Sequence, residues 1–408
     1  MTVHCRFCAA TLSQSLVDLG KAPLANSYLA QAEDIANEQR FPLHVMVCNE
    51  CWLVQTTETI PADAIFHKDY AYLSSYSASW VNHARSYAMD MAKRFDLDGN
   101  SMVVEIASND GYLLQHFAQM GVPVLGVEPA GHAASLAIEK GVPSRVEFFG
   151  EAYAEELVRE GFAADLMAAN NVLAHVPDIR DFIKGFKALL KPKGVATFEF
   201  PHVAQLIQHV QFDTIYHEHY SYLSLLFLET LLSAADLQVF DVEELTTHGG
   251  SLRLFVGHPG VRTVTEKVDR IRALERDMRL DARGGYDQFG AQVAQVVSNA
   301  KSFLETQKQS GKSIAGYGAA AKGNTFLHVA EIGTGLIDFV VDRNPEKQGT
   351  LLPGSHIPVV SPDEISDQKP DFLFILPWNI APEVMQQQSH IRNWGGRFVT
   401  AIPRLTVQ

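Results

Sequence analysis

The four cysteines of the chain form two pairs with the spacing of a zinc site. They stand as Cys5-x-x-Cys8 and Cys48-x-x-Cys51, with 39 residues between the pairs and no cysteine left over. Two thiolates separated by two residues can bind one side of a tetrahedral ion, and a second pair completes the four-sulfur shell that zinc prefers. Because a closed shell has no position for a substrate, we expect this zinc to be structural. Two redox dithiols, or four unrelated buried cysteines, are the alternatives.

Polar residues that could bind a ligand stand at the ends of several short apolar runs. They are Glu105, Asn109, Asp110 and Gly111 at the first run, Glu128 and Pro129 at the second, and Asn170 and Asn171 at the fourth. The runs, at 101–106, 123–127, 145–149, 164–169 and 194–200, alternate with helical periodicity, which predicts βαβ units and a parallel sheet. Because ligands bind at the carboxyl ends of such strands, we expect these residues to lie together.

The turn after the first run and the acid after the second indicate a nucleoside site. Small residues in the turn let the backbone approach a ligand, and Glu128 can accept hydrogen bonds from two ribose hydroxyls. The turn lacks the G-x-G-x-x-G pattern of a pyrophosphate loop. A ribose held in this way fits S-adenosylmethionine (SAM) better than a dinucleotide, and a tight turn followed by a solvated acid is the alternative.

These segments together resemble a class I SAM-dependent methyltransferase. The matching stretches, from about residue 100 to 245, are VVEIASNDGYLL, VLGVEPA, MAANNVLAHVPD, LKPKGVATFEF and FLETLLSAADLQVFDVEEL. Many members of that family have glycine where this chain has Ala107, so we do not expect Ala107 to contact the cofactor closely.

Over its whole length the chain resembles the nucleotide-sugar C-methyltransferases of branched deoxysugar biosynthesis. The resemblance rests on the four-cysteine module and on the stretches YHEHYSYLS, HGGSLR and GYGAAAKGNT. It implies that a base removes the proton at sugar C3, next to a C4 ketone, and that the enolate attacks the methyl group of SAM. The sugar is then carried on a nucleoside diphosphate, most often dTDP.

His219 is the best candidate in the chain for such a base. Imidazole has an unperturbed pKa of about 6.5, and the adjacent carboxylate of Glu218 would orient the ring and stabilise the imidazolium. Tyr216 precedes this pair, and the resemblance places the family's base at His219 and a second histidine, a donor to the sugar or enolate, at His175. The alternatives are a metal pair with His217, which lacks two further ligands nearby, and a surface histidine without a role.

The resemblance also implies a set of residues that bind the nucleotide-sugar. They are Tyr70, Tyr72, His248, Gly249, Lys322 and Asn324. For Tyr70 and Tyr72, an apolar plug between two domains is the alternative.

A second doubly wound pattern occupies the last hundred residues. A run at 313–317 leads into Gly316-x-Gly318-x-x-Ala321, which approaches a dinucleotide fingerprint, and a run at 337–341 ends at Asp342. The main alternative function is therefore an NAD-dependent oxidoreductase acting on a nucleotide-sugar, with Asp342 on the ribose hydroxyls. In the family, this domain is a Rossmann-like remnant that helps to bind the nucleotide-sugar. A non-catalytic, zinc-containing binding protein is the third class.

Length and charge set the remaining expectations. We expect an α/β protein with a zinc module at 1–75, a class I SAM methyltransferase core at 76–258, a helical connector at 259–310 and a Rossmann-like domain at 311–408. The formal net charge of −14 disfavours nucleic acid and anionic lipid as partners. With no secretory segment and no uncharged run of roughly 18–20 residues, the sequence predicts a soluble cytoplasmic protein. It does not indicate an oligomeric state.

Overall fold

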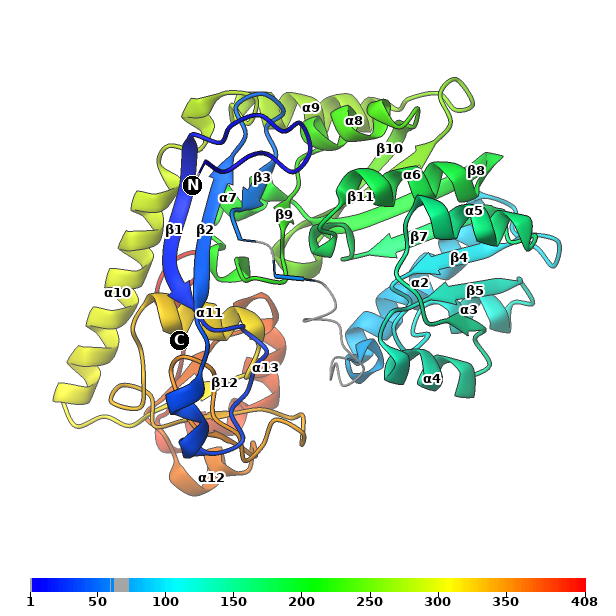
Figure 1. The fold of residues 1–408 in the computed structure, drawn as a ribbon. Helices are drawn as coiled ribbons and strands as arrows, with labels where there is room; N and C mark the ends of the chain where they lie inside the picture. Colours follow the sequence, from blue (N-terminus) through cyan, green and yellow to red (C-terminus); the bar gives the residue numbers. More distant parts are fainter. Residues whose placement is uncertain (1, 59, 62–72) are drawn as a thin grey trace.

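The computed structural model describes residues 2–58, 60–61 and 73–408, whose strands form three sheets (Figure 1). The N-terminal sheet is antiparallel and includes a strand from the middle of the chain. Its order is β1-β2-β3-β9, with the bounds Gln14–Ala22, Phe41–Val47, Val54–Thr56 and Ser221–Tyr222. Two of these strands, β1 and β2, lie between the two cysteine pairs, so the segment that separates the pairs is structured.

The central sheet has seven strands in the order β10-β11-β8-β7-β4-β5-β6. Their bounds are Gln238–Leu245, Ser251–Gly257, Leu190–Pro201, Ala164–Asn170, Val103–Ile106, Val124–Val127 and Ser144–Arg145. The strands from β8 to β6 are parallel, and β11 is antiparallel to both of its neighbours. The carboxyl ends of β4, β5, β7 and β8 therefore share one edge.

Helices cover both faces of this sheet because neighbouring strand residues point in opposite directions. Val104 packs in one core with α5, α6 and α8, whereas Val103 packs in another with α2 and α3. The helices are α2 Ala78–Arg94, α3 Leu114–Gln119, α4 Gly131–Glu139, α5 Glu151–Arg159, α6 Ile179–Leu189, α7 Val203–Gln208 and α8 Leu225–Ala234.

Four of the five predicted strands of this region are present, and the strand expected at 145–149 is not. Only Ser144–Arg145 pairs with β5, as the edge of the sheet. Beyond this pair, Val146 and Phe148 are half exposed, and Phe149 packs against the core on Phe182 and Phe186 without belonging to the strand. The strand expected at 194–200 is longer than predicted, since β8 already begins at Leu190.

The last third of the chain contains two long helices and a third sheet. The helices α9 (Glu266–Asp277) and α10 (Phe289–Gln309) lie in the region 259–310, where a helical connector is expected, and α10 runs beside β1 (Figure 1). The third sheet has the order β14-β13-β12-β15-β16-β17, and only β17 is antiparallel. Its strands are Val359–Val360, Phe339–Val341, Ile314–Tyr317, Phe372–Ile375, Arg397–Thr400 and Thr406–Val407. Its helices are α11 Ala321–Val329, α12 Glu364–Gln368 and α13 Ala381–Gln387.

Short 3-10 helices complete the described structure. They are Ala32–Asn37, Ser74–Tyr76, Leu173–His175, Phe212–Thr214, Thr247–Gly249, Arg283–Gly285, Trp378–Ile380 and Ser389–Trp394. Within the described part of the chain, every helix is too short or too polar to cross a bilayer.

Candidate active site

Two matching turns bring the four cysteine sulfurs within 4.8 Å of one another. The carbonyl of Cys5 accepts from the N–H of Ala9, that of Cys48 accepts from Trp52, and both Ala9 and Trp52 are left-handed. The closest sulfur pairs are Cys5 with Cys51 at 3.6 Å and Cys8 with Cys48 at 3.4 Å. This is the only such group of His, Cys, Asp and Glu side chains among the residues described. Four thiols at this spacing, without a carboxylate, are the donor set of a structural zinc.

The predicted ribose acid, Glu128, lies where β5 ends beside the turn that follows β4. Its two carboxylate oxygens accept from the N–H of Asn109 at 2.9 Å and of Ala130 at 2.7 Å. Burial raises the pKa of Glu128, and these two bonds offset part of the rise. The turn itself is tight, since Ala107, Asn109 and Gly111 all have positive φ. Position 107 is therefore left-handed, a conformation that favours glycine, and Ala107 is strained there.

Several buried oxygen atoms at this edge of the sheet have no hydrogen-bond partner among the described residues. They are the Oδ1 atoms of Asp110, Asn170 and Asn171, and the buried carboxylate of Glu105 has the phenol of Tyr112 as its one neighbouring donor among these residues. Burial raises the pKa of Glu105 well above its usual value, and the neighbouring phenol of Tyr112 offsets only part of the rise. The second oxygen of Asp110 is paired with Lys140 at 2.8 Å.

This set of acceptors fits SAM. A ligand that satisfies buried, unpaired acceptors must bring hydrogen-bond donors and positive charge. SAM carries an ammonium group, a sulfonium centre and two ribose hydroxyls. Glu105, Asp110 and the two asparagines at the end of β7 are therefore residues that would hold it. Glu128 lies beside them, and each of its oxygens can accept a second hydrogen bond, from a ribose hydroxyl.

His219 lies next to this edge, with its ring fixed by a backbone carbonyl. Its Nδ1 is 2.8 Å from the carbonyl oxygen of Thr214, and the ring packs on Tyr216 with centroids 4.0 Å apart. Burial lowers the pKa of His219 well below its usual value, and His175 adds to this effect. The ring is therefore neutral at neutral pH. Because Nδ1–H donates to the carbonyl, Nε2 carries the lone pair.

His175 is held in the same way. Its Nδ1 donates to the carbonyl oxygen of Glu218 at 2.9 Å, and burial lowers its pKa to about 4. A neutral ring that donates through Nδ1 can only accept through Nε2. In this tautomer Nε2 of His175 accepts a hydrogen bond, so the predicted role as a donor to the sugar or enolate would require the protonated ring.

The neighbours of His219 do not act on its ring as the sequence suggested. The carboxylate of Glu218 accepts from Asn26 Nδ2 at 2.6 Å, and His217 Nε2 lies 3.2 Å from the carbonyls of Phe41 and Pro42. Residues 217 and 218 form a turn, closed by the N–H of His219 on the carbonyl of Tyr216 at 2.9 Å. Glu218 bonds to the N-terminal module, whereas His219 bonds to Thr214. Thr214, and not Glu218, orients the His219 ring. His217 bonds to β2, and among the described residues the two histidines belong to no group of three or more metal ligands, so the structure does not favour the alternative of a His217–His219 metal pair.

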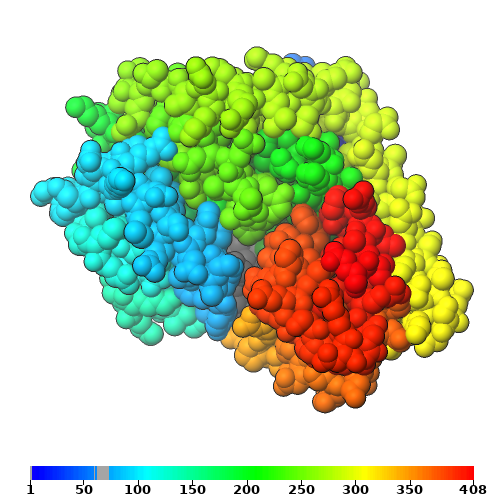
Figure 2. Space-filling model, turned by 180° about the vertical axis from the view of Figure 1, so that it is seen from behind, coloured from blue at the N-terminus to red at the C-terminus, as the bar shows by residue number. Residues whose placement is uncertain are grey.

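The C-terminal domain meets this region through Trp378, which follows β15. Trp378 Nε1 donates to Asp213 at 2.7 Å, and Lys322 lies 5.3 Å above the Trp378 ring while donating to Asn379 at 2.8 Å. A side chain at Gly249 would collide with the Trp378 ring. In the view from behind, the light-blue segment that includes α2 lies across from the orange C-terminal domain (Figure 2).

His248 links this contact to the SAM edge. Its Nε2 accepts from Asn171 Nδ2 at 3.0 Å, and its ring meets the edge of Trp80 at 5.3 Å. Burial lowers the pKa of His248 to about 4, and the charge of Lys322 contributes to this shift. Of the predicted sugar residues, His248, Gly249 and Lys322 thus lie close together.

Two other predicted residues of the C-terminal half have protein partners. Asn324 is buried and donates to the carbonyl of Ala25 at 2.7 Å, so its amide nitrogen joins α11 to the N-terminal module. The carboxylate of Asp342 accepts from the N–H groups of Ala319 and Asn344, both at 2.8 Å. The acid that would hold an NAD ribose therefore closes the turn of its own domain.

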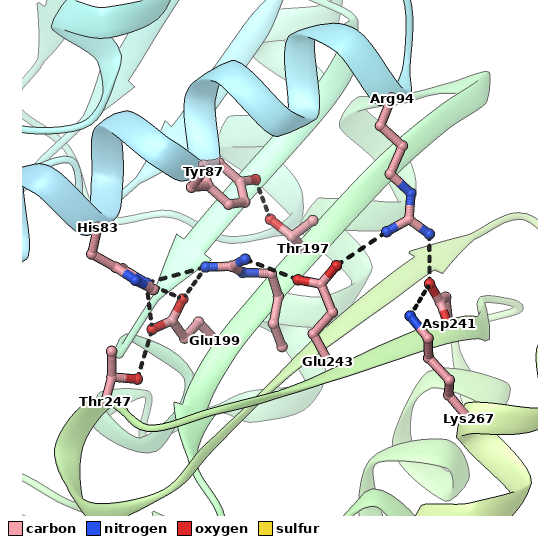
Figure 3. Close-up of polar contacts among 10 residues, drawn as sticks. His83, Tyr87, Arg94, Thr197, Glu199, Asp241, Glu243, Thr247 and Lys267 are labelled. Atoms are coloured by element: carbon pink, nitrogen blue, oxygen red, sulfur yellow. Dashed lines mark hydrogen bonds and ion pairs between the residues drawn. The ribbon is translucent and has the colours of Figure 1, made fainter.

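A buried cluster of charges behind the edge was missed by the sequence analysis (Figure 3). Glu199, on β8, is fully buried and bonds to Arg253 at 2.7 Å, to His83 at 2.9 Å and to Thr247 at 3.1 Å. Arg253 also pairs with Glu243 at 3.0 Å. The sequence signal for this cluster is one charged residue in each of two otherwise apolar strand segments, Glu199 in TFEF and Arg253 in LRLF. Tyr70 and Tyr72 lie outside the residues that the structure describes.

The strand order, the acceptor-lined edge and the four-sulfur cluster define a class I SAM-dependent methyltransferase with a zinc-binding N-terminal module. Three family models match the chain: a "Putative zinc binding domain" over residues 5–66, a "Methyltransferase domain" over 80–242 and a "C-methyltransferase C-terminal domain" over 246–403. The C-methyltransferase NovU of Streptomyces niveus is 35% identical over 401 residues, which cover 98% of this chain and 95% of NovU. The chain belongs to this C-methyltransferase family.

More distant similarities are confined to part of the chain. A ubiquinone biosynthesis O-methyltransferase of Bradyrhizobium sp. is 27% identical over 165 residues, covering 35% of this chain and 64% of the relative. The structure of magnesium protoporphyrin IX methyltransferase from Synechocystis has 14% identity and a TM-score of 0.36, covering 44% of this chain and 83% of that one. The family assignment makes the protein a SAM-dependent C-methyltransferase. The oxidoreductase and the non-catalytic binding protein are therefore set aside.

Proposed function

We propose that this enzyme transfers a methyl group from SAM to C3 of a dTDP-linked 4-keto-deoxysugar through an enolate. The main support is the protonation state of His219, which is a buried, neutral imidazole whose Nδ1 donates to the carbonyl of Thr214. Its Nε2 can accept a proton at neutral pH, which a base for a carbon acid next to a ketone requires.

In the proposed reaction, His219 Nε2 takes the C3 proton and the electron pair moves onto the C4 oxygen. C3 then forms a bond to the methyl carbon, the carbon–sulfur bond breaks, and the proton on His219 returns to solvent. Bound SAM supplies the methyl group and leaves as S-adenosylhomocysteine. Glu105, Asn109, Asp110, Gly111, Glu128, Pro129, Asn170 and Asn171 form the proposed cofactor site.

The developing enolate needs a hydrogen-bond donor or a positive charge. Neutral His175 donates through Nδ1 to Glu218, so its Nε2 accepts and suits a sugar hydroxyl better. His248 already accepts from Asn171 through Nε2, which leaves its Nδ1–H as a neutral donor. The phenol of Tyr216 packs on His219, and the charge of Lys322 is close enough to lower the pKa values of both His219 and His248. We assign enolate stabilisation to Tyr216 and Lys322.

The remaining assignments follow from placement. Glu218 holds the segment of the base through Asn26, and Gly249 and Asn324 shape the sugar-nucleotide site from the central and C-terminal domains. The proposed sugar contacts also include Tyr70 and Tyr72. We place the enzyme in the cytoplasm, where nucleotide-sugars are made.

The proposal is tested by hydrogen exchange without methyl transfer. The enzyme is incubated in D₂O with S-adenosylhomocysteine and a dTDP-linked 4-keto-6-deoxyhexose, and deuterium at C3 is followed by NMR. Enzyme-dependent deuteration at C3 is the expected result. Methylation of the same sugar in the presence of SAM, but at an oxygen atom, would overturn the proposal.

A further inference from the structure

The strand that follows His219 belongs to the sheet of the zinc module. β9 (Ser221–Tyr222) pairs with β3, with Gln55 opposite Ser221 and Val54 opposite Tyr222. The N–H of Thr56 also donates to the carbonyl of Tyr220 at 3.1 Å. The residue next to the proposed base is therefore bonded to the N-terminal module.

Side chains before the strand are fastened to the same module. His217 bonds to the β2 carbonyls, and Glu218 accepts from Asn26. The hydroxyl of Tyr220 donates to the carbonyl of Ile60. The side chain of His219, in contrast, bonds to the central domain, at the carbonyl of Thr214.

Gln55 connects this strand directly to the zinc site. It is 1% exposed, its Nε2 donates to Cys5 Sγ at 3.2 Å, and its Oε1 accepts from the N–H of Arg6 at 2.9 Å. Arg6 in turn donates to the carbonyl of Thr56 at 2.8 Å and lies 5.3 Å above the ring of Tyr220. One amide thus spans from a cysteine ligand to the strand that pairs with β9.

We propose that Gln55 and Arg6 are positioning residues that transmit the geometry of the zinc turns to His219. A zinc-bound thiolate is a fixed acceptor, so the hydrogen bond from Gln55 would fix the position of β3 relative to the metal. Because β3 pairs with β9, it would in turn fix the position of β9. A displacement of about 1 Å at a catalytic group can cost 10²-fold in rate. The inference rests on the proposed role of His219 as the base.

The test uses Gln55→Met, which keeps the size of the side chain and removes both hydrogen bonds. The matched control is Gln14→Met in β1 of the same sheet. Gln14 is also buried, but its Nε2 donates to Arg283 O at 2.9 Å and Asp287 Oδ1 at 3.0 Å, on the connector side. Both variants keep all four cysteines and the SAM edge.

For Gln55→Met we expect one zinc per chain and a SAM dissociation constant within about twofold of wild type. The rate of C3 deuteration should fall by at least about tenfold. Backbone amides of residues 216–222 should exchange faster by mass spectrometry, a readout that needs no substrate. Gln14→Met should leave both the C3 deuteration and the amide exchange of this segment unchanged.

The inference is overturned if zinc-loaded Gln55→Met deuterates C3 at the wild-type rate, or if Gln14→Met shows the same loss. Should Gln55→Met fail to fold, Arg6→Met is used instead, because it removes only the side-chain bond to Thr56 and the contact with Tyr220. C3 deuteration at the wild-type rate in zinc-loaded Arg6→Met would then overturn the inference. If wild type itself does not deuterate C3, the proposed function fails instead. The amide exchange of residues 216–222 then still tests whether Gln55 couples the zinc turns to this segment.

Discussion

The imidazole rings of His175 and His219 lie with centroids 4.6 Å apart and planes inclined by 67°. Each ring donates through Nδ1 to a backbone carbonyl, that of Glu218 for His175 and that of Thr214 for His219. Two imidazolium ions at this distance would repel each other, and burial already lowers both pKa values. The pair is therefore suited to hold one proton at a time.

We expect His219→Asn to lower turnover by at least about two orders of magnitude, because general-base catalysis contributes typically 10²–10⁴-fold. SAM affinity by calorimetry should stay near the wild-type value, and C3 deuteration should be lost. His44→Asn, a change at a half-buried histidine on β2 bonded to Ser15, is the control. Deuteration at the wild-type rate in His219→Asn would assign the base elsewhere, with His175 or Tyr216 next.

The pH dependence follows from the same residue. Since burial lowers the pKa of His219, the base is neutral above that lowered value and is blocked only below it. Turnover should therefore stay level as the pH falls to about 6.5 and decline only well below. Lys322→Met removes a positive charge that also lowers this pKa, so it should move the decline to higher pH. An unchanged profile would show that Lys322 does not act on the base.

The four cysteines should hold one zinc per chain. Cys5→Ser and Cys48→Ser each remove one thiolate from the cluster, and loss of a structural zinc removes folding free energy. Both variants should have a lower melting temperature and substoichiometric zinc by mass spectrometry. Ser13→Ala, a change at an exposed residue near the cluster, should alter neither quantity. Native protein without zinc would contradict the assignment.

Glu128→Ala should weaken SAM binding by about 10- to 100-fold, because hydrogen bonds to a charged group are worth roughly 1.5–3 kcal/mol. The variant also leaves the N–H groups of Asn109 and Ala130 without their present partner. Glu128→Gln keeps one carbonyl acceptor and should lose less. Calorimetry measures both affinities, with circular dichroism to verify the fold. Unchanged affinity in Glu128→Ala would exclude it from the ribose site.

Removing Arg253 should destabilise the fold by about 3–5 kcal/mol, since it leaves a buried carboxylate without its charge partner. Burial alone would raise the pKa of Glu199, yet His83 and Arg253 hold it below its usual value. The pair therefore adds stability above the unfolded pKa of a glutamate, and this stability is lost as the pH falls through the lowered value.

Urea unfolding of Arg253→Met, compared with Arg270→Met, measures this effect. Arg270 pairs with Glu244 at 3.0 Å, but both side chains are exposed, so little change is expected there. Adding Glu199→Gln to Arg253→Met should recover part of the loss. A destabilisation of Arg253→Met no larger than that of Arg270→Met would contradict the structural role of the pair.

The sequence predicted those parts of the site that depend on local spacing. The cysteine pairs, and the acids at the ends of β4 and β5, are fixed by a few consecutive residues and were found. The orientation of Glu218 was not, because its partner Asn26 is 192 residues away and leaves no local pattern. The strand expected at 145–149 shows the same limit, since a strand extends only as far as its neighbour offers pairing.

The pairing of β3 with β9 also sets the order of assembly during synthesis. At roughly 5–20 residues per second, the N-terminal strands leave the ribosome many seconds before residue 222. Until β9 has been synthesised, the edge of β3 that pairs with it is open. The carbonyl of Ala25 acquires its partner Asn324, 299 residues away, later still. Open edges recruit other chains, so early metal binding cannot by itself protect the nascent module. Its native state requires the chain to return twice, so this first-made part is completed only after residue 324 has been synthesised.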